Sequence, residues 1–316
     1  MAFTVAYATD NNYVQHVAGS LFSLFSNSCK DEKILVFILG NKLSRDNAEK
    51  LQQVAKDFGH DVNIVDISDI EELLPVGVDV ANLSISTYCR LFLAELLPAS
   101  VNEVLYLDCD TLVGDNITEI SDYVKSDDWY IAGVEDTMYP HMKRGIGLGA
   151  KDLYINAGVL YINLKRWRSD NVIKLFIEFI KSFNGSVPHL DQGVINGVFQ
   201  TGKIKLPLRY NVQSPIYAIH RYSDLIDYFS LSSFYSPKEV KEAKLKPCII
   251  HFTSFFVERP WFSFCLHPFR SQYRRSLKNT PFANIPLKTN GISMTSKIKD
   301  LAFKYFQPFY LILKRR

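Results

Sequence analysis

Val104-Leu105-Tyr106-Leu107-Asp108-Cys109-Asp110 is the stretch of this 316-residue chain that decides its fold. Four residues with strand character run directly into two aspartates one residue apart. In an extended segment, residues i and i+2 point to the same side, so Asp108 and Asp110 present two carboxylates together. Such a pair is unfavourable unless a positive charge lies between them, and a divalent cation that holds a phosphate is the natural candidate. The alternative is a strand that ends in an acidic turn, because the Asp-x-Asp triplet is common.

The region around this stretch alternates strand and helix signals. Apolar runs predict strands at 3–8, 34–39, 62–65 and 103–108. Apolar stripes at helical spacing predict helices at 14–25, 44–58 and 86–97, the second with Ser44 as its N-cap. This order is typical of an α/β fold with a doubly wound, mostly parallel sheet, which binds ligands beyond the carboxyl ends of its strands. Asp10 and the Asp108/Asp110 pair both follow such ends.

Beyond residue 110 the pattern is less regular. Strands are predicted at 130–134, 159–163 and 248–251, and helices at 167–183 and 192–199. Residues 206–247 are rich in Tyr, Ser and Pro and are expected to form loops and short helices over the sheet. The simplest division is one catalytic domain, residues 1–280, and a basic and aromatic C-terminal tail, residues 281–316.

The composition limits the classes of function. Of the 316 residues, 47% are hydrophobic and 22% charged, which is ordinary for a globular protein with a core. The net charge of +3 is uneven, because residues 291–316 hold six basic side chains against Asp300 alone. The rest of the chain therefore carries a charge of about −2, which argues against nucleic-acid binding.

Cysteine usage and the absence of long apolar segments favour a cytoplasmic protein. The cysteines are five in number and form no Cys-x-x-Cys pair, which argues against a disulfide framework and for a reducing compartment. Met1 is followed directly by an apolar run, without a basic leader. No apolar stretch reaches the ~18 residues that a bilayer-spanning helix needs.

Polar and glycine residues recur in six stretches between residues 5 and 261. These are Val-Ala-Tyr-Ala-Thr-Asp-Asn-Asn-Tyr (5–13), Ser-Thr-Tyr-Cys-Arg-Leu-Phe (86–92), Leu-Tyr-Leu-Asp-Cys-Asp (105–110), Asn-Ala-Gly-Val (156–159), His-Leu-Asp-Gln-Gly-Val-Ile-Asn (189–196), and His251 followed by Arg-Pro-Trp (259–261). In this order they resemble the family 8 retaining glycosyltransferases, the group of bacterial lipopolysaccharide hexosyltransferases and glycogenin. The resemblance implies a GT-A-type nucleotide-diphospho-sugar transferase fold and transfer of glucose or galactose from a UDP-sugar to a glycan or glycolipid acceptor. Lipopolysaccharide or another surface polysaccharide is the expected acceptor.

The resemblance also implies a metal site. Asp108, Asp110 and His251 would hold Mn²⁺, with Mg²⁺ as the alternative, because two carboxylates and an imidazole suit a slightly softer ion. The ion would bridge the two phosphates of the donor and neutralise charge on the leaving group. For His251 the competing interpretation is an ordinary strand-end histidine.

The donor-binding residues implied by the resemblance are Ala8, Thr9, Asp10, Tyr13, Arg90, Asn156, Asp191, Gln192 and Arg259. Asp10 can accept a hydrogen bond from the uracil N–H, and Tyr13 can stack on the base. Asp10 and the Asp191-Gln192 pair could instead cap helices, and Arg90 could be a surface arginine.

Arg90, Asp191 and Gln192 are the predicted catalytic residues. Retention can proceed through a covalent glycosyl-enzyme or through attack of the acceptor on the face that UDP leaves. Gln192 is a poor nucleophile, and Asp191 is the only carboxylate nearby in the motif. The same-face route is therefore favoured, with the leaving phosphate as base.

One segment departs from the family pattern His-x-x-Gly-x-x-Lys-Pro-Trp. Ser254 stands where the glycine belongs, two extra residues precede Pro260, and Arg259 takes the place of the lysine. Arginine can hold a diphosphate through two parallel hydrogen bonds, so the replacement is chemically sensible. The path of this loop is left open by the sequence.

The run Gly-Ile-Gly-Leu-Gly-Ala (145–150) is not a dinucleotide fingerprint. Its spacing is Gly-x-Gly-x-Gly, no clear strand precedes it, and no acidic residue closes a β-α-β unit. We expect a flexible loop that closes over the donor.

The tail combines lysines with a helical stripe of Ile298, Leu301, Ala302 and Tyr305, which Pro308 interrupts. Basic residues beside exposed aromatics suit an anionic membrane surface, so we expect a peripheral protein on the cytoplasmic face of the membrane. The alternative is a C-terminal helix docked on the body.

Three other functions compete with hexose transfer. A nucleotide-sugar hydrolase or a nucleotidyltransferase could use the same metal site. A non-catalytic nucleotide-sugar-binding protein at the membrane is disfavoured, because Asp108, Asp110 and His251 are all present. An NAD-dependent oxidoreductase would rest on the glycine run alone.

Overall fold

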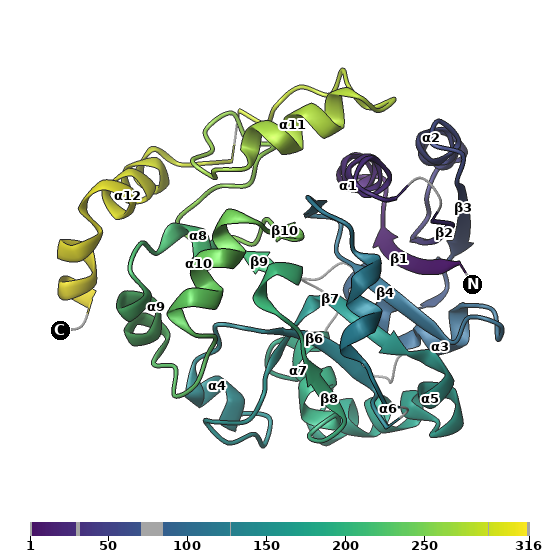
Figure 1. Ribbon diagram of the computed structural model, residues 1–316, viewed down its shortest axis with the longest axis horizontal. Coiled ribbons are helices and arrows are strands. Elements are labelled where there is room, and N and C mark those ends of the chain that lie inside the picture. Colours follow the sequence, from purple (N-terminus) through teal and green to yellow (C-terminus); the bar gives the residue numbers. More distant parts are fainter. Residues whose placement is uncertain (1, 30–31, 71–84, 127, 290, 315–316) are drawn as a thin grey trace.

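A computed structural model describes residues 2–29, 32–70, 85–126, 128–289 and 291–314 of the chain. Its centre is a seven-stranded sheet in the order β3-β2-β1-β4-β7-β6-β8 (Figure 1). The strands are β1 (Phe3–Thr9), β2 (Ile34–Gly40), β3 (Asp61–Asp66), β4 (Glu103–Leu107), β6 (Ile131–Glu135), β7 (Ile155–Asn163) and β8 (Lys203–Lys205). Only β7 runs antiparallel to its two neighbours, β4 and β6. The predicted mostly parallel α/β sheet is therefore confirmed.

Alternation along the strands sorts the core into two layers. Val5 and Tyr7 of β1 belong to one buried cluster, and Ala6 and Ala8 to the other. The first face is covered by α1 (Val14–Ser26), α2 (Arg45–Lys56) and α11 (Arg270–Lys278). The second face is covered by the 3₁₀ helix η2 (Ile85–Phe92) and by α3 (Leu93–Leu96), α5 (Leu164–Ser169), α6 (Val172–Ser182) and α7 (Leu190–Val198). The predicted cap of α2 is confirmed, because the Ser44 side chain accepts a hydrogen bond from the Asn47 N–H.

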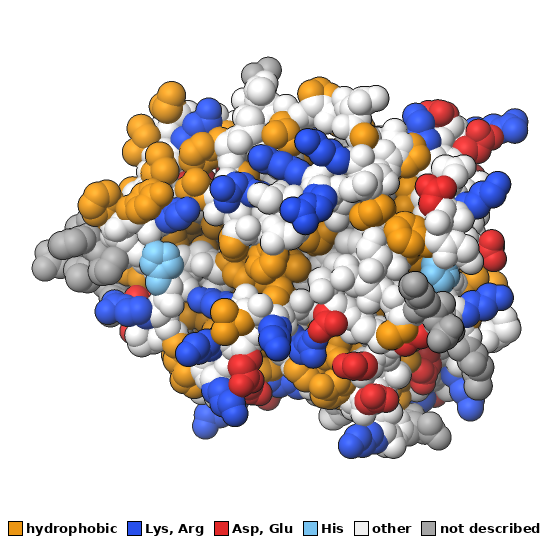
Figure 2. All heavy atoms as spheres, turned by 45° about the horizontal axis from the view of Figure 1, so that its top comes forward, with side chains coloured by type: hydrophobic (Ala, Val, Ile, Leu, Met, Phe, Trp, Pro, Cys, Tyr) orange, Lys and Arg blue, Asp and Glu red, His pale blue; other side chains and the backbone are white. Residues whose placement is uncertain are grey.

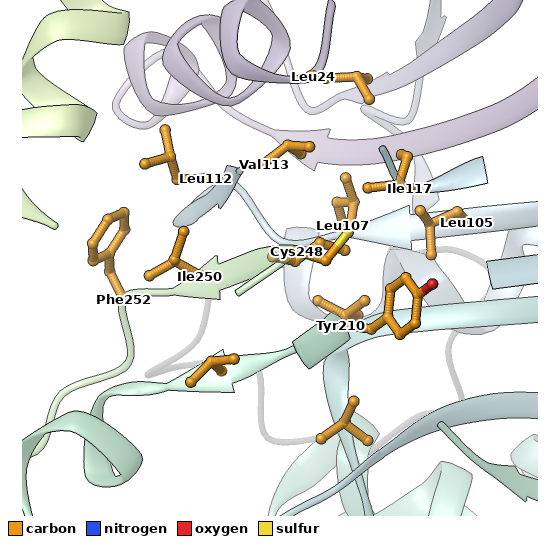
Figure 3. Close-up of a cluster of buried hydrophobic side chains, with 14 of the residues drawn as sticks. Leu24, Leu105, Leu107, Leu112, Val113, Ile117, Tyr210, Cys248, Ile250 and Phe252 are labelled. Atoms are coloured by element: carbon orange, nitrogen blue, oxygen red, sulfur yellow. The ribbon is translucent and has the colours of Figure 1, made fainter. Parts of the chain in front are cut away.

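A second, three-stranded sheet joins distant parts of the chain beside the first. It consists of β5 (Thr111–Val113), β10 (Ile249–His251) and β9 (Val212–Gln213), in the order β5-β10-β9. Leu112, Val113, Ile250 and Phe252 pack together with Leu24 of α1 in the same buried cluster (Figure 3). The antiparallel register pairs His251 with Thr111, so the sheet brings the end of β10 next to the aspartate pair that precedes β5.

Two predicted helices differ in detail. The helix predicted at 86–97 is a 3₁₀ helix followed by the short α3; Tyr88 and Cys89 are buried, so packing overrides helical propensity there. The helix predicted at 167–183 is two helices, α5 and α6, because Asn171 between them has a φ of 48°, which no helix interior accommodates.

Residues 206–247 form the short helices and loops expected from their composition, and one short strand in addition. They contain η4 (Leu208–Tyr210), β9, α8 (Ser214–Ala218), α9 (Tyr222–Phe229) and α10 (Pro237–Leu245). β9 supplies the edge strand of the second sheet. The remaining short elements outside this region are η3 (Thr118–Tyr123) and α4 (Pro140–Arg144).

The tail forms α12 (Met294–Lys314), which docks on the body. Its contact face contains Phe303, Gln307 and Leu311, which are at most 5% exposed. The predicted stripe lies elsewhere on the helix, since Ile298 and Tyr305 are 58% and 64% exposed. The helix kinks at Phe306, two residues before Pro308, which cannot donate the backbone hydrogen bond of a regular turn. Within the described residues, no helix is long and apolar enough to cross a bilayer.

Candidate active site

The predicted site residues converge on one cleft of about 620 Å³ at the carboxyl ends of β1 and β4. This volume lies in the range of small-molecule binding sites. The residues that line the cleft are Ala8, Thr9, Asp10, Tyr13, Arg90, Tyr106, Asp108, Cys109, Asp110, Asn156, Ala157, Gly158, His189, Asp191, Gln192 and Arg259. Of the residues predicted from the sequence, His251 alone is missing from this lining, because it is buried directly behind the two aspartates.

Asp108, Asp110 and His251 form a compact cluster, with one ligand atom of each within 4.8 Å of the others. His251 Nε2 lies 3.1 Å from Asp110 Oδ1 and 3.8 Å from Asp108 Oδ2. On the far side of the ring, His251 Nδ1 lies 3.1 Å from Asn211 Oδ1. An amide oxygen only accepts, so this contact places a proton on Nδ1 and turns Nε2 toward the carboxylates.

The electrostatics of the cluster favour a positive charge between these groups. Burial would lower the pKa of His251, but the charges of Asp110 and Asp108 outweigh it and raise that pKa. Burial works against the Asp110 carboxylate, yet His251 and Arg259 keep its pKa below the ordinary value. A proton on His251 offsets part of the negative charge of the two aspartates, which a bound cation would also do.

Gly158 of β7 allows His251 and Asp108 to pack directly against the backbone of β7. A Cβ at this position would lie 2.3 Å from His251 Cε1 and 2.6 Å from Asp108 Oδ2. Carboxylate oxygens and an imidazole nitrogen are suitable ligands for Mn²⁺ or Mg²⁺. The ligand atoms of the three side chains are therefore a suitable set for a divalent cation.

Arg90 is the buried cation of the site, not a surface arginine. Its guanidinium donates to Asp108 Oδ1 at 2.8 Å and to the carbonyl of Ala157, and it lies over the ring of Tyr106. Its Nε also lies 2.9 Å from Asp191 Oδ2, at ion-pair distance but without hydrogen-bond alignment. Arg90 therefore links the metal-side carboxylate with the carboxylate of α7.

A strained turn presents Asp191 and Gln192 at the start of α7. His189 and Leu190 have φ values of 60° and 57°, which non-glycine residues seldom adopt. The turn packs tightly against Gly193 of α7. A Cβ on Gly193 would lie 1.9 Å from the carbonyl oxygen of Pro188. Burial raises the pKa of Asp191 to about 6, although Arg90 opposes the shift.

Asp136 is a site residue that the sequence analysis missed. It follows β6 and is 8% exposed, and its Oδ2 accepts hydrogen bonds from Asn156 Nδ2 at 3.1 Å and Gln192 Nε2 at 3.0 Å. These contacts orient the Gln192 amide so that its oxygen accepts from the Ala157 N–H. The available signal was an acidic residue close to the end of the strand predicted at 130–134, similar to the signal that singled out Asp10.

The turn after β1 forms one end of the cleft. One oxygen of Asp10 accepts hydrogen bonds from the backbone N–H groups of Asn12 and Tyr13 and so fixes the turn before α1. The N-cap of α1 is Tyr13 and has no side-chain cap, so Asp10 is not the helix cap that the alternative predicted. Tyr13 is 40% exposed and lines the cleft, with its ring edge toward Trp261. Asn11 holds the Lys42–Ser44 turn and has a structural role.

The loop that the sequence left open, residues 252–260, turns back on itself. Arg259 Nε donates to the Phe252 carbonyl at 3.1 Å and lies 3.6 Å from Asp110 Oδ2. The guanidinium is thereby placed at the rim of the cleft beside the candidate cation site.

The glycine run 145–150 contributes no residue to the lining of the cleft in the described structure. It follows α4 and is tied to the body by Lys143, whose Nζ donates to the carbonyls of Ala150 and Asp152. Its role as a lid over the donor stays a prediction.

Comparison with solved structures defines the class of protein. A crystal structure of the galactosyltransferase LgtC in complex with donor and acceptor sugar analogues matches with a TM-score of 0.72, at 22% identity, over 94% of this chain and 100% of that one. Mouse xyloside xylosyltransferase 1 matches with a TM-score of 0.56 over 79% of this chain and 97% of that one, at 15% identity. The chain therefore has the GT-A-type fold of nucleotide-sugar transferases.

Comparison of sequences narrows the class to a family. The model for glycosyl transferase family 8 matches residues 4–265, and the chain belongs to this family. General stress protein A of Bacillus subtilis is 24% identical, over 89% of this chain and 95% of that protein. Lipopolysaccharide 1,3-galactosyltransferase of Salmonella typhimurium is also 24% identical, over 90% of this chain and 80% of that protein. The resemblance found in the sequence motifs is confirmed.

Proposed function

We propose that this glycosyltransferase moves a hexose, glucose or galactose, from a UDP-sugar to a glycan acceptor with retention at the anomeric carbon, and that it needs a divalent cation. The observation that carries the proposal is the cluster of Asp108, Asp110 and His251 in the cleft that also contains Arg90 and Gln192. Mn²⁺ is the expected ion, and Mg²⁺ is the alternative.

The donor-side roles follow from the positions in the cleft. Asp108, Asp110 and His251 would hold the cation, which would supply positive charge to offset the charge of the diphosphate and of the leaving UDP. Arg259 at the rim would hold the diphosphate, and Asp10 with Tyr13 would bind the uracil. Ala8 and Thr9, at the end of β1, allow the backbone to approach the nucleotide.

The sugar lies toward Asn156, Asp191 and Gln192 in this proposal. Asp191 is engaged with Arg90, which makes it a poor nucleophile. The Gln192 amide is held between Asp136 and the Ala157 N–H, where it can stabilise positive charge that develops on the sugar. These contacts favour attack of the acceptor on the face that UDP leaves, with a phosphate oxygen of UDP accepting the acceptor proton.

The acceptor is assigned by analogy with relatives whose names state one. Two of them are a lipopolysaccharide 1,3-galactosyltransferase and a lipopolysaccharide 1,2-glucosyltransferase. Lipopolysaccharide or another surface glycan is therefore the first acceptor to test.

A panel of UDP-sugars with Mn²⁺, scored for UDP release with and without glycan acceptors, tests the function. We expect release to depend on acceptor, and Asp108→Asn and Asp110→Asn to lower turnover by at least about 10³-fold, because cation binding would fail. The exposed Asp122→Asn serves as the control. Equal UDP release without acceptor would identify a nucleotide-sugar hydrolase, and near-normal turnover of either aspartate variant would disprove the metal assignment.

The exposed face of α12 supports the proposed membrane association. Met294, Ile298, Leu301 and Tyr305 are spaced four, three and four residues apart and are each at least 38% exposed. Hydrophobic side chains gather at the end of the molecule where α12 lies, with Lys and Arg side chains nearby (Figure 2). We propose that this stripe adsorbs to an anionic leaflet on the cytoplasmic side, with the lysines toward the headgroups.

Vesicle sedimentation tests the membrane proposal. The double variant Ile298→Ser, Tyr305→Ser removes the stripe and leaves the docked face of α12 intact. Sedimentation with phosphatidylglycerol vesicles should fall for this variant and for deletion of residues 291–316. If the double variant sediments like the unmodified protein, the stripe has no membrane role.

A further inference from the structure

The docked face of α12 packs on the loop that carries Arg259. The Phe303 ring is 1% exposed and stacks on Phe256, with 4.2 Å between ring centroids and 7° between ring planes. Phe303 also meets Phe255 edge-on at 5.8 Å, and Tyr310 of α12 meets Phe256 at 5.3 Å. The C-terminal helix therefore contacts two consecutive residues of loop 252–260.

The backbone of this loop needs support from outside. Phe256 has a φ of 46°, a region that a bulky L-residue adopts only when its surroundings hold it there. Before this point the Phe252 N–H donates to the Asp110 carbonyl, and after it Arg259 donates back to the Phe252 carbonyl. A shift of the backbone at Phe256 would consequently change the position of the Arg259 guanidinium relative to the candidate metal ligand Asp110.

A second contact ties α12 to α8, which is in turn bonded to the start of loop 252–260. Gln307 is 1% exposed, donates to the Ala218 carbonyl and accepts from the His220 N–H, so it satisfies backbone groups at the end of α8. α8 begins at Ser214, whose N–H donates to the Thr253 side chain at the start of the loop. The helix is thus anchored independently of the ring contacts.

We propose that α12 is a positioning element of the donor site, which holds loop 252–260 and its Arg259 in place through Phe303. The proposal rests on the proposed function for the role of Arg259, but the mechanical link between helix and loop does not. A consequence is that a displacement of α12, for example on binding at its exposed face, would move Arg259 through the contact between Phe303 and Phe256.

The test uses Phe303→Ala in the full-length protein, with Phe25→Ala as the matched control. Phe25 is also a buried phenylalanine, at the end of α1 remote from the cleft, where it packs on Phe58 and His60. Two readouts are measured, namely hydrogen–deuterium exchange of peptides that cover 252–260 and the steady-state parameters for the UDP-hexose. Phe303→Leu keeps apolar volume and replaces the alanine variant should that variant fold poorly.

We expect faster exchange in 252–260 and a rise of about tenfold in KM for the donor, with a smaller change in kcat, for Phe303→Ala and not for Phe25→Ala. Phe303→Leu should give smaller changes in the same direction. Unchanged exchange in the loop, or faster exchange with an unchanged KM, overturns the proposal. If the unmodified protein uses no UDP-hexose, the proposed function fails, and the exchange measurement alone still decides whether α12 holds the loop.

Discussion

Gly158 shows how one missing side chain makes the candidate metal site. It lies in β7, opposite β4 and its two aspartates, and an added methyl group would overlap the ring of His251 and a carboxylate oxygen of Asp108. The buried imidazole is fixed by Asn211 and cannot move away cheaply. At this position a smaller residue than alanine is required by contact distances alone.

Gly158→Ala should therefore abolish cation binding. We expect loss of Mn²⁺ affinity and activity together with a destabilisation of about 1–3 kcal/mol from overpacking. Isothermal titration with Mn²⁺ and thermal unfolding measure the two effects. Gly19→Ala is the control, because a Cβ there meets no atom closer than 3.8 Å. Normal Mn²⁺ binding by Gly158→Ala would contradict the assigned site.

Asp136 is expected to act through Gln192. In Asp136→Asn, one acceptor oxygen is replaced by an amide that competes with the donors of Asn156 and Gln192. Misplacement of the Gln192 amide should lower kcat by about 10- to 100-fold and affect the donor KM less. Steady-state kinetics of this variant and of the exposed Asp122→Asn make the comparison. An unaltered kcat would show that Asp136 does not position Gln192 for catalysis.

At the scale of an element, α12 presents two apolar faces. The sequence pattern left open a membrane-binding stripe or a docked helix. The helix docks on the body through one face, and the predicted stripe lies exposed on another, where membrane binding stays a proposal. Phe303, Gln307 and Leu311 face the body, while Ile298 and Tyr305 face solvent. Residue spacing identifies an apolar stripe on a helix, but it does not tell which stripe packs against the body of the protein.

Docking of α12 should depend on pH through Asp300. This carboxylate is 6% exposed, its Oδ2 has no hydrogen-bond partner among the described residues, and burial with the nearby charge of Glu258 raises its pKa to about 6. The folded state thus holds the proton more tightly than the unfolded chain. Stability from this group is fully present below about pH 4, falls as the pH rises to about 6, and then stays low.

Asp300→Asn should consequently raise the melting temperature at pH 7.5 and leave it unchanged at pH 4. The full shift in the pKa of Asp300 corresponds to about 3 kcal/mol in the free energy of unfolding. Solvent screening at the helix edge reduces this to about 1 kcal/mol, which is about 2 °C in melting temperature. Melting curves of both proteins from pH 4 to 8 provide the measurement. A constant difference across this range would exclude titration of Asp300 as the cause.

At the scale of the whole molecule, the site joins segments that lie far apart in the chain, from residue 8 to residue 259. β1, β4, β7, α7 and loop 252–260 each contribute to one cleft. A donor bound there would contact segments of both sheets and should raise the free energy of unfolding of the whole native state. The gain follows from mass action and reaches about 2.7 kcal/mol when the free ligand is at 100 times its Kd.

UDP together with Mn²⁺ should therefore raise the melting temperature, while either alone should do so less, because the diphosphate and the cation share contacts. Differential scanning fluorimetry with UDP, Mn²⁺, both, and both plus EDTA measures this dependence. Asp110→Asn should show little combined effect. An equal shift by UDP with and without Mn²⁺ would argue that the nucleotide binds without a cation.

The sequence by itself determined the strands that lead to Asp10 and Asp108, the helix cap at Ser44, and the motif residues that now share one cleft. The strands and the helix cap depend on spacing within about ten residues, where backbone geometry dictates which side chains lie on one face, whereas the motif residues were found through their resemblance to a family. Only the tertiary structure decided that Arg90 bridges Asp108 and Asp191, that Asp136 and Asn211 orient their neighbours, and that Phe303 docks α12 on loop 252–260. Each of these contacts joins segments far apart in the chain. They arise because burial forces polar groups to find partners and apolar rings to find neighbours wherever the packed layers bring them together.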